Sequence, residues 1–137
     1  MKRRYYRLIF YYLSVFLCFI VGIQLIPLLC RPFYPEEASY AYCFLLPGII
    51  SMFVGYLGLF SLKMKETPRL EKNYDSILVV LVWILAILVS ACPWMLTGHY
   101  NFTQAVFEMT SGYSTTGLTV VDVATCPHIF LLFRSIT

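Results

Sequence analysis

The chain has 137 residues, of which 60 % are hydrophobic and 12 % are charged, and its formal net charge is +3. A soluble domain is about half apolar and about a quarter charged, so this composition excludes an ordinary soluble domain and is typical of an integral membrane protein. The basic residues lie beside apolar blocks, which argues against nucleic-acid binding. No nucleophile–base pair, metal-ligand spacing or phosphate-binding loop is found, so the sequence predicts neither an enzyme nor a bound cofactor.

Three apolar blocks, at 8–30, 40–62 and 76–97, contain no charged side chain. Each is long enough to cross a bilayer, which takes about 20 residues. In lipid only a helix pairs all of its own backbone polar groups within one segment, so all three blocks are predicted to be transmembrane helices. The first block exceeds a signal-peptide core and no A-x-A-like cleavage site follows it, which predicts an uncleaved helix.

The basic residues predict the orientation of these helices. Four of them precede the first block and four more lie in the 63–75 loop: Lys2, Arg3, Arg4, Arg7, Lys63, Lys65, Arg69 and Lys72. The positive-inside rule then places the N-terminus and this loop in the cytoplasm. Trp94 and Tyr100 would belong to the aromatic belt at the outer interface.

The second block has small residues at Gly48, Ser51, Gly55 and Gly58, which share one side of a helix. Small residues let helices approach closely in lipid. One alternative function is therefore a non-conducting small membrane protein that assembles with other helices through this face.

Five cysteines, at positions 18, 30, 43, 92 and 126, show no metal or redox spacing. Cys30 and Cys43 bracket a short loop, so a disulfide between them and a set of buried free thiols both remain open.

A short helix is predicted after the third block. Asn101 and Gln104 have the spacing of a helix start, and apolar residues then recur at helical intervals as far as Tyr113. The helix must stop near Gly112, which makes it about eleven residues and too short to span. A Ser/Thr/Gly segment at 114–119 follows, and a new apolar helix begins near Pro127.

This order of segments predicts an all-α integral membrane fold with three transmembrane helices, a re-entrant pore helix with a filter loop, and the start of a fourth transmembrane helix. Non-helical backbone at membrane depth is tolerated where it lines a water-filled path, and its carbonyls can replace the hydration shell of a cation. Gly117 supplies the permissive backbone dihedrals. The predicted domains are an N-terminal helix pair at 1–62 and an incomplete helix–pore-loop–helix repeat at 63–137.

The segments FEMTSGYSTTGLT at 107–119 and PHIFLLFR at 127–134 resemble the first pore region of the Trk/Ktr/HKT superfamily of potassium transport proteins, most of all its bacterial TrkH/TrkG-type subunits. The resemblance implies that Thr115, Thr116, Gly117 and Leu118 supply carbonyls that bind K⁺ in one quarter of a selectivity filter, and that Thr119 closes the strand. Leu118 stands where the family pattern has alanine. The resemblance also implies that the chain is the N-terminal fragment of a protein with four such repeats.

Further expectations come from the same resemblance. It implies a multi-pass protein of the bacterial cytoplasmic (inner) membrane that contacts lipid, with the remaining pore repeats or other subunits completing the pore. A cytoplasmic nucleotide-binding regulatory subunit and a homodimer of the full-length subunit are also expected.

Three charged residues near the filter segment have two interpretations each. Glu108 could draw cations toward the filter, or form an ion pair or hydrogen bond behind it. Asp122 could raise the local cation concentration, or be an ordinary solvated loop acid. Arg134 could brace the filter loop through carbonyl contacts, or extend toward the membrane surface.

Overall fold

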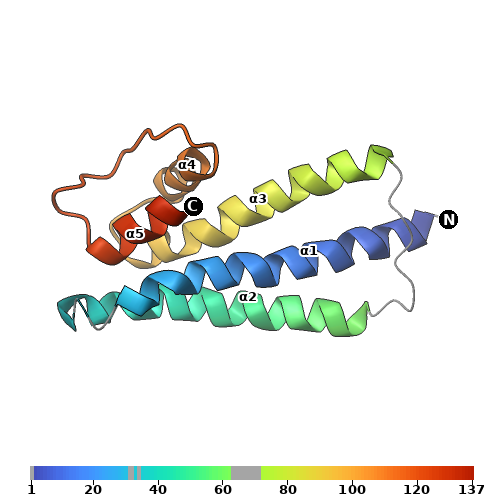
Figure 1. The fold of residues 1–137 in the computed structure, drawn as a ribbon, viewed down its shortest axis with the longest axis horizontal. Helices are drawn as coiled ribbons and strands as arrows, with labels where there is room; N and C mark the ends of the chain where they lie inside the picture. The colour runs from blue at the N-terminus through green and yellow to red at the C-terminus, as the bar shows by residue number, and fades with distance from the viewer. Residues whose placement is uncertain (1, 31–32, 34, 63–71) are drawn as a thin grey trace.

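The computed structural model describes residues 2–30, 33, 35–62 and 72–137 and is all-helical, with no strand in these ranges (Figure 1). The elements in chain order are α1 (Lys2–Leu25), the 3-10 helices η1 (Ile26–Cys30) and η2 (Pro35–Tyr40), α2 (Ala41–Ser61), α3 (Lys72–Leu96), α4 (Phe102–Tyr113) and α5 (His128–Ile136). The prediction of an all-α fold is confirmed.

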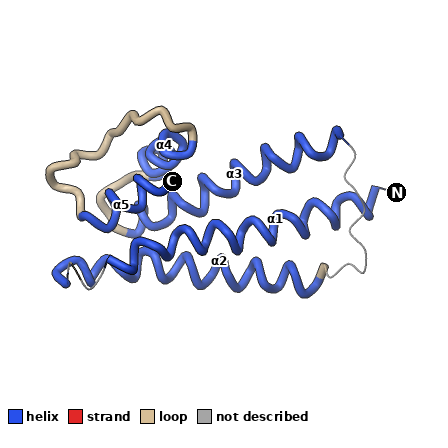
Figure 2. Tube along the Cα trace, viewed as in Figure 1, coloured by secondary structure: helices blue, strands red, loops and turns tan. Residues whose placement is uncertain are grey.

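Three segments are long and apolar enough to cross a membrane: Tyr6–Leu29, Pro35–Ser61 and Asp75–Leu96. They agree with the blocks predicted from the sequence. Figure 2 shows α1, α2 and α3 running along the long axis as a bundle, with α4 and α5 at one end. Residues 63–71, which form most of the predicted cytoplasmic loop, lie outside the described residues.

The outer surface of the bundle is apolar. Phe19, Phe53 and Phe60 are each more than half exposed, and many other large apolar side chains on the three long helices are exposed as well. A soluble monomer rarely exposes so continuous an apolar surface, whereas lipid tails cover it without cost.

The small residues of α2 pack against α1. A Cβ atom added to Gly55 would lie 2.7 Å from the Cys18 Sγ atom, and one added to Gly58 would overlap the Ser14 hydroxyl. Ser51 lies elsewhere, in an apolar groove that it shares with Cys92 of α3. The expectation that this face binds other helices is therefore wrong for its glycines, because α1 of the same chain already covers them.

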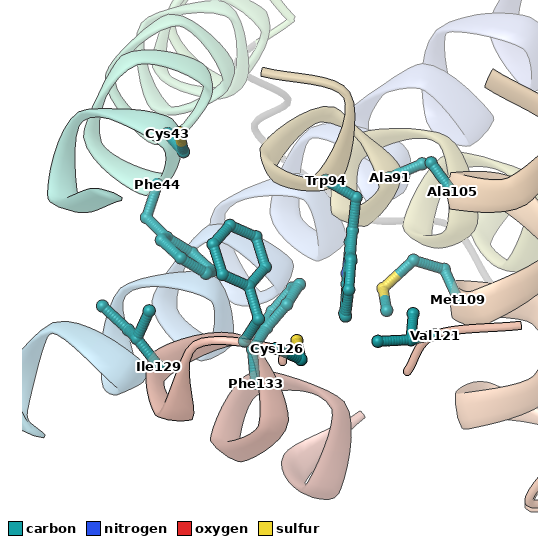
Figure 3. Packing of buried hydrophobic residues seen from close by; sticks show 11 residues of the cluster. Cys43, Phe44, Ala91, Trp94, Ala105, Met109, Val121, Cys126, Ile129 and Phe133 are labelled. Carbon is teal, nitrogen blue, oxygen red and sulfur yellow. The ribbon is translucent and has the colours of Figure 1, made fainter. Parts of the chain in front are cut away.

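A compact core joins α4 and α5 to the end of the bundle (Figure 3). Trp94 of α3 lies at its centre, fully buried, with its ring 4.9 Å from that of Phe130 and 5.2 Å from that of Tyr100. Phe44 of α2 packs on Phe130 and on Phe133 of α5. Because α4 and α5 fold back over it, Trp94 packs inside the protein, and its predicted place in the aromatic belt at the outer interface stays a prediction.

The described cysteines are free thiols. Cys43 is buried and unbonded to any other cysteine, so the alternative of a disulfide with Cys30 is excluded. Burial raises the pKa of the Cys126 thiol to about 11, which keeps it neutral at physiological pH.

We predict that Gly55→Leu destabilises the bundle by about 1–3 kcal/mol, because the added side chain must push against Cys18 and the Ser14 carbonyl. The measurement is the midpoint of helicity loss when the purified protein is titrated with a denaturing detergent. Gly22→Leu is the matched control, since a Cβ there meets no atom within 4 Å. Equal midpoints for the two variants would contradict the packing of Gly55 on α1.

Candidate functional site

Helix α4 begins and ends where local sequence signals predict. The backbone N–H of Asn101 donates to Gln104 Oε1 at 2.9 Å, which satisfies one free group at the start of the helix. The 12 residues of α4 extend about 18 Å, well short of the roughly 30 Å hydrocarbon core. The Tyr113 hydroxyl lies 2.8 Å from the Ser90 hydroxyl. The C-terminal end of α4 therefore lies beside the apolar span of α3 rather than beyond it.

The segment after α4 turns back over the end of this helix. The N–H of Thr115 donates to the Gly112 carbonyl at 2.9 Å, and that of Thr116 donates to the Ser111 carbonyl at 3.1 Å. Thr115 has φ 55° and Gly117 has φ 76°. Glycine adopts positive φ freely, but a β-branched residue there stores strain of roughly 1–3 kcal/mol. Such strain persists only where the surrounding structure enforces it, and strained residues cluster at functional sites.

The carbonyl oxygens of this segment fall into two kinds. Within the described part of the chain, no donor reaches those of Thr115, Thr116 or Gly117, and all three residues are exposed. The Leu118 carbonyl instead accepts from Ser111 Oγ at 2.6 Å and from Arg134 Nη2 at 2.6 Å. A carbonyl oxygen has two lone pairs. Both lone pairs of the Leu118 carbonyl are therefore occupied by donors from the same chain. This geometry does not support an ion-facing role for that carbonyl.

Glu108 holds the segment from the α4 side. Its carboxylate is fully buried and accepts three hydrogen bonds, from Thr119 Oγ1 at 2.8 Å, from the Val120 N–H at 2.5 Å and from Arg134 Nε at 2.7 Å. A buried carboxylate is tolerated only with such partners. Of its two interpretations, the structure shows the ion pair behind the loop.

Arg134 is the second support. Its guanidinium contacts both the Glu108 carboxylate and the Leu118 carbonyl, so it bridges α5, α4 and the loop. Of the two interpretations of Arg134, the structure shows the carbonyl contact. Thr119 belongs to the same support, because its hydroxyl donates to Glu108 and accepts from the Val121 N–H at 3.0 Å.

Asp122 lies apart from this network. Its Oδ1 atom accepts from the Ala124 N–H at 3.1 Å, and it lines a cavity of about 370 Å³ together with His99, Tyr100 and Thr125. The carboxylate is exposed. Both interpretations of Asp122 therefore stay open.

Two residues of this region escaped the sequence analysis. Ser111 donates to the Leu118 carbonyl, and its spacing of one helical turn from Glu108 was the available signal. Glu37 contacts His128 and Ile129 across 91 and 92 positions of sequence, and no local signal indicates this pairing.

The chain is similar to two curated proteins over most of its length. It is 31 % identical over 124 residues, or 88 % of the chain, to the Trk system potassium uptake protein TrkG of Escherichia coli. It is 29 % identical over 120 residues, or 85 % of the chain, to an uncharacterized cation transporter of Methanocaldococcus jannaschii. The chain spans about a quarter of the length of these relatives, 25 % and 24 %.

No family model matches the chain, and no solved structure matches it significantly. Both relatives are transport proteins by name, and neither is an enzyme. Together with the three apolar helices, the similarities show that the chain is a multi-pass membrane protein related to the Trk-type potassium transporters.

Proposed function

We propose that this chain takes part in potassium transport across the cytoplasmic membrane, as the N-terminal part of a Trk-type uptake subunit, and that residues 115–117 form one quarter of its selectivity filter. The observation that carries the proposal is the row of free carbonyls at Thr115, Thr116 and Gly117, next to a Leu118 carbonyl that is held from behind. The relationship to a potassium uptake protein and to a cation transporter supports it.

The proposed mechanism is the exchange of water for backbone oxygen. A cation that enters the filter gives up hydration, and carbonyl oxygens replace the lost water ligands. The carbonyl end of the α4 dipole carries partial negative charge, which favours cations over anions. Glu108 and Arg134 neutralise each other, so this pair holds the loop in shape without adding net charge at the filter.

One strand cannot surround an ion, so we propose that further pore repeats or other subunits complete the filter. The exposed loop at Thr115–Gly117 would face them. In this arrangement residues 1–62 are the N-terminal transmembrane helix pair, and residues 63–137 belong to the first repeat. The basic residues favour a cytoplasmic N-terminus, and the family resemblance favours the bacterial inner membrane. A homodimer and a cytoplasmic nucleotide-binding regulatory subunit remain proposals from the family resemblance.

We predict that the native gene product restores growth of uptake-deficient bacteria at low potassium, and that Gly117→Asp abolishes this rescue. Any side chain strains the backbone at φ 76°, and a carboxylate there would bind the ion too tightly or block its path.

Gly98→Asp is the matched control for this experiment. Gly98 has φ 74° and, like Gly117, has no atom within 4 Å of an added Cβ, but it lies in the turn between α3 and α4. Rescue should survive in the control. Unchanged rescue by Gly117→Asp would remove the filter assignment.

We predict that Arg134→Met and Glu108→Gln each reduce the rate of K⁺ uptake strongly, and that the double variant is less impaired than the sum of the two losses. Arg134→Met leaves the Glu108 carboxylate without its cation, and Glu108→Gln leaves the Arg134 guanidinium without its anion. Breaking a buried ion pair in this way costs about 3–5 kcal/mol. The double change removes both charges and leaves neither unpaired. The partly exposed position of Arg134 lowers this cost.

The readout is ⁸⁶Rb⁺ or K⁺ uptake normalised to the amount of protein in the membrane. Glu36→Gln serves as a control that neutralises an exposed carboxylate outside the pair. Strictly additive losses in the double variant would show that the two side chains do not act together.

A further inference from the structure

Glu37 connects two parts of the chain that are distant in sequence. It belongs to η2, between α1 and α2, and its side chain is 17 % exposed. Its Oε1 atom accepts from the His128 N–H at 2.9 Å and lies 2.8 Å from His128 Nδ1. Its Oε2 atom accepts from the Ile129 N–H at 3.0 Å. One carboxylate therefore binds the first two residues of α5.

These contacts replace a local helix cap. The first N–H groups of a helix have no partner within the helix, and a preceding Ser, Thr, Asp or Asn usually accepts from them. Pro127 precedes α5, and it provides no side-chain hydrogen bond. Glu37 supplies the missing acceptor from another element, and its negative charge lies at the positive end of the α5 dipole.

The other end of α5 contacts the loop at 115–118 that forms the proposed filter. Arg134 lies about 9 Å further along the same helix, where it donates to the Leu118 carbonyl and to Glu108. The short helix α5 is also packed on Phe44 of α2 through Phe130 and Phe133. A continuous series of direct contacts thus runs from η2 through α5 to the loop at 115–118.

We propose that Glu37 is a positioning residue for the filter: through α5 it sets where Arg134 holds the Leu118 carbonyl, so that the N-terminal helix pair determines the geometry of the free carbonyls. This inference rests on the proposed function. It gives the α1–α2 pair a part in ion selection, although it contributes no residue to the filter segment.

The test compares Glu37→Ala, Glu37→Gln and His128→Ala in the native gene product. The measurements are the amount of protein in the membrane, the rate of K⁺ uptake, and the ratio of K⁺ to Na⁺ uptake. Ala removes all three contacts, Gln keeps one acceptor oxygen, and His128→Ala keeps both backbone contacts. Glu36→Ala is the matched control, because Glu36 precedes Glu37 in the same η2, carries the same charge and is exposed.

We expect Glu37→Ala to lower the ratio of K⁺ to Na⁺ uptake by at most about fivefold, because losing one helix cap changes the equilibrium between the held and the displaced α5 by about that factor. Glu37→Gln and His128→Ala should have smaller effects in the same direction, and Glu36→Ala should match the wild type. A merely structural role would lower the amount of protein or the total uptake without changing the ratio, so a constant ratio overturns the inference.

The outcomes separate this inference from the proposed function. If the unaltered protein transports no K⁺, the proposed function fails before Glu37 is considered. If it transports K⁺ and Glu37→Ala keeps the wild-type ratio, the proposed function stands and the role of Glu37 is overturned. If Glu37→Ala does not reach the membrane, Glu37→Gln and His128→Ala replace it in the test. A lowered ratio of K⁺ to Na⁺ uptake in these variants supports the role of Glu37, and a wild-type ratio overturns it.

Discussion

The arrangement of the C-terminal third depends on one buried charge. Glu108 is fully buried, and an ionised carboxylate without partners in such a place would cost several kcal/mol. Its three donors come from the loop after α4 and from α5, so satisfying the charge brings both onto α4. The same Arg134 that neutralises it also holds the Leu118 carbonyl. A single electrostatic requirement therefore shapes the loop, places α5 and leaves the preceding carbonyls free.

The loop itself is energetically unfavourable in isolation. Thr115 has positive φ, and the carbonyls of residues 115–117 lack donors within the described part of the chain. Exposed carbonyls in water are hydrated, but at membrane depth they need another partner. In the proposed filter, a cation and the neighbouring strands would supply that partner. Rigid contacts behind the loop offset its strain and keep the oxygens from turning inward.

Two different kinds of packing provide the base for this loop. Small residues on α2 let α1 approach closely, where Gly55 lies against Cys18. At the other end of the bundle, large rings pack around Trp94 and close the space between α2, α3 and α5. The close-packed helix pair gives a stiff platform, and the aromatic core joins α4, the loop after it and α5 to this platform. Glu37 adds a polar connection at the start of α5, so the platform and the loop are linked by charge as well as by packing.

The sequence by itself determined the features that depend on local pattern. Apolar blocks without a charged side chain predicted the three long helices, Asn101 and Gln104 predicted the start of α4, and Gly117 indicated a backbone that needs permissive dihedrals, which is found at φ 76°. Only the tertiary structure decided which neighbour covers each surface. It buried Trp94 under α5, placed α1 over the glycines of α2, and paired Glu37 with a helix 91 positions away. The physical reason is that composition and periodicity report whether a face is apolar, small or charged, whereas its partner depends on the path of the whole chain in space.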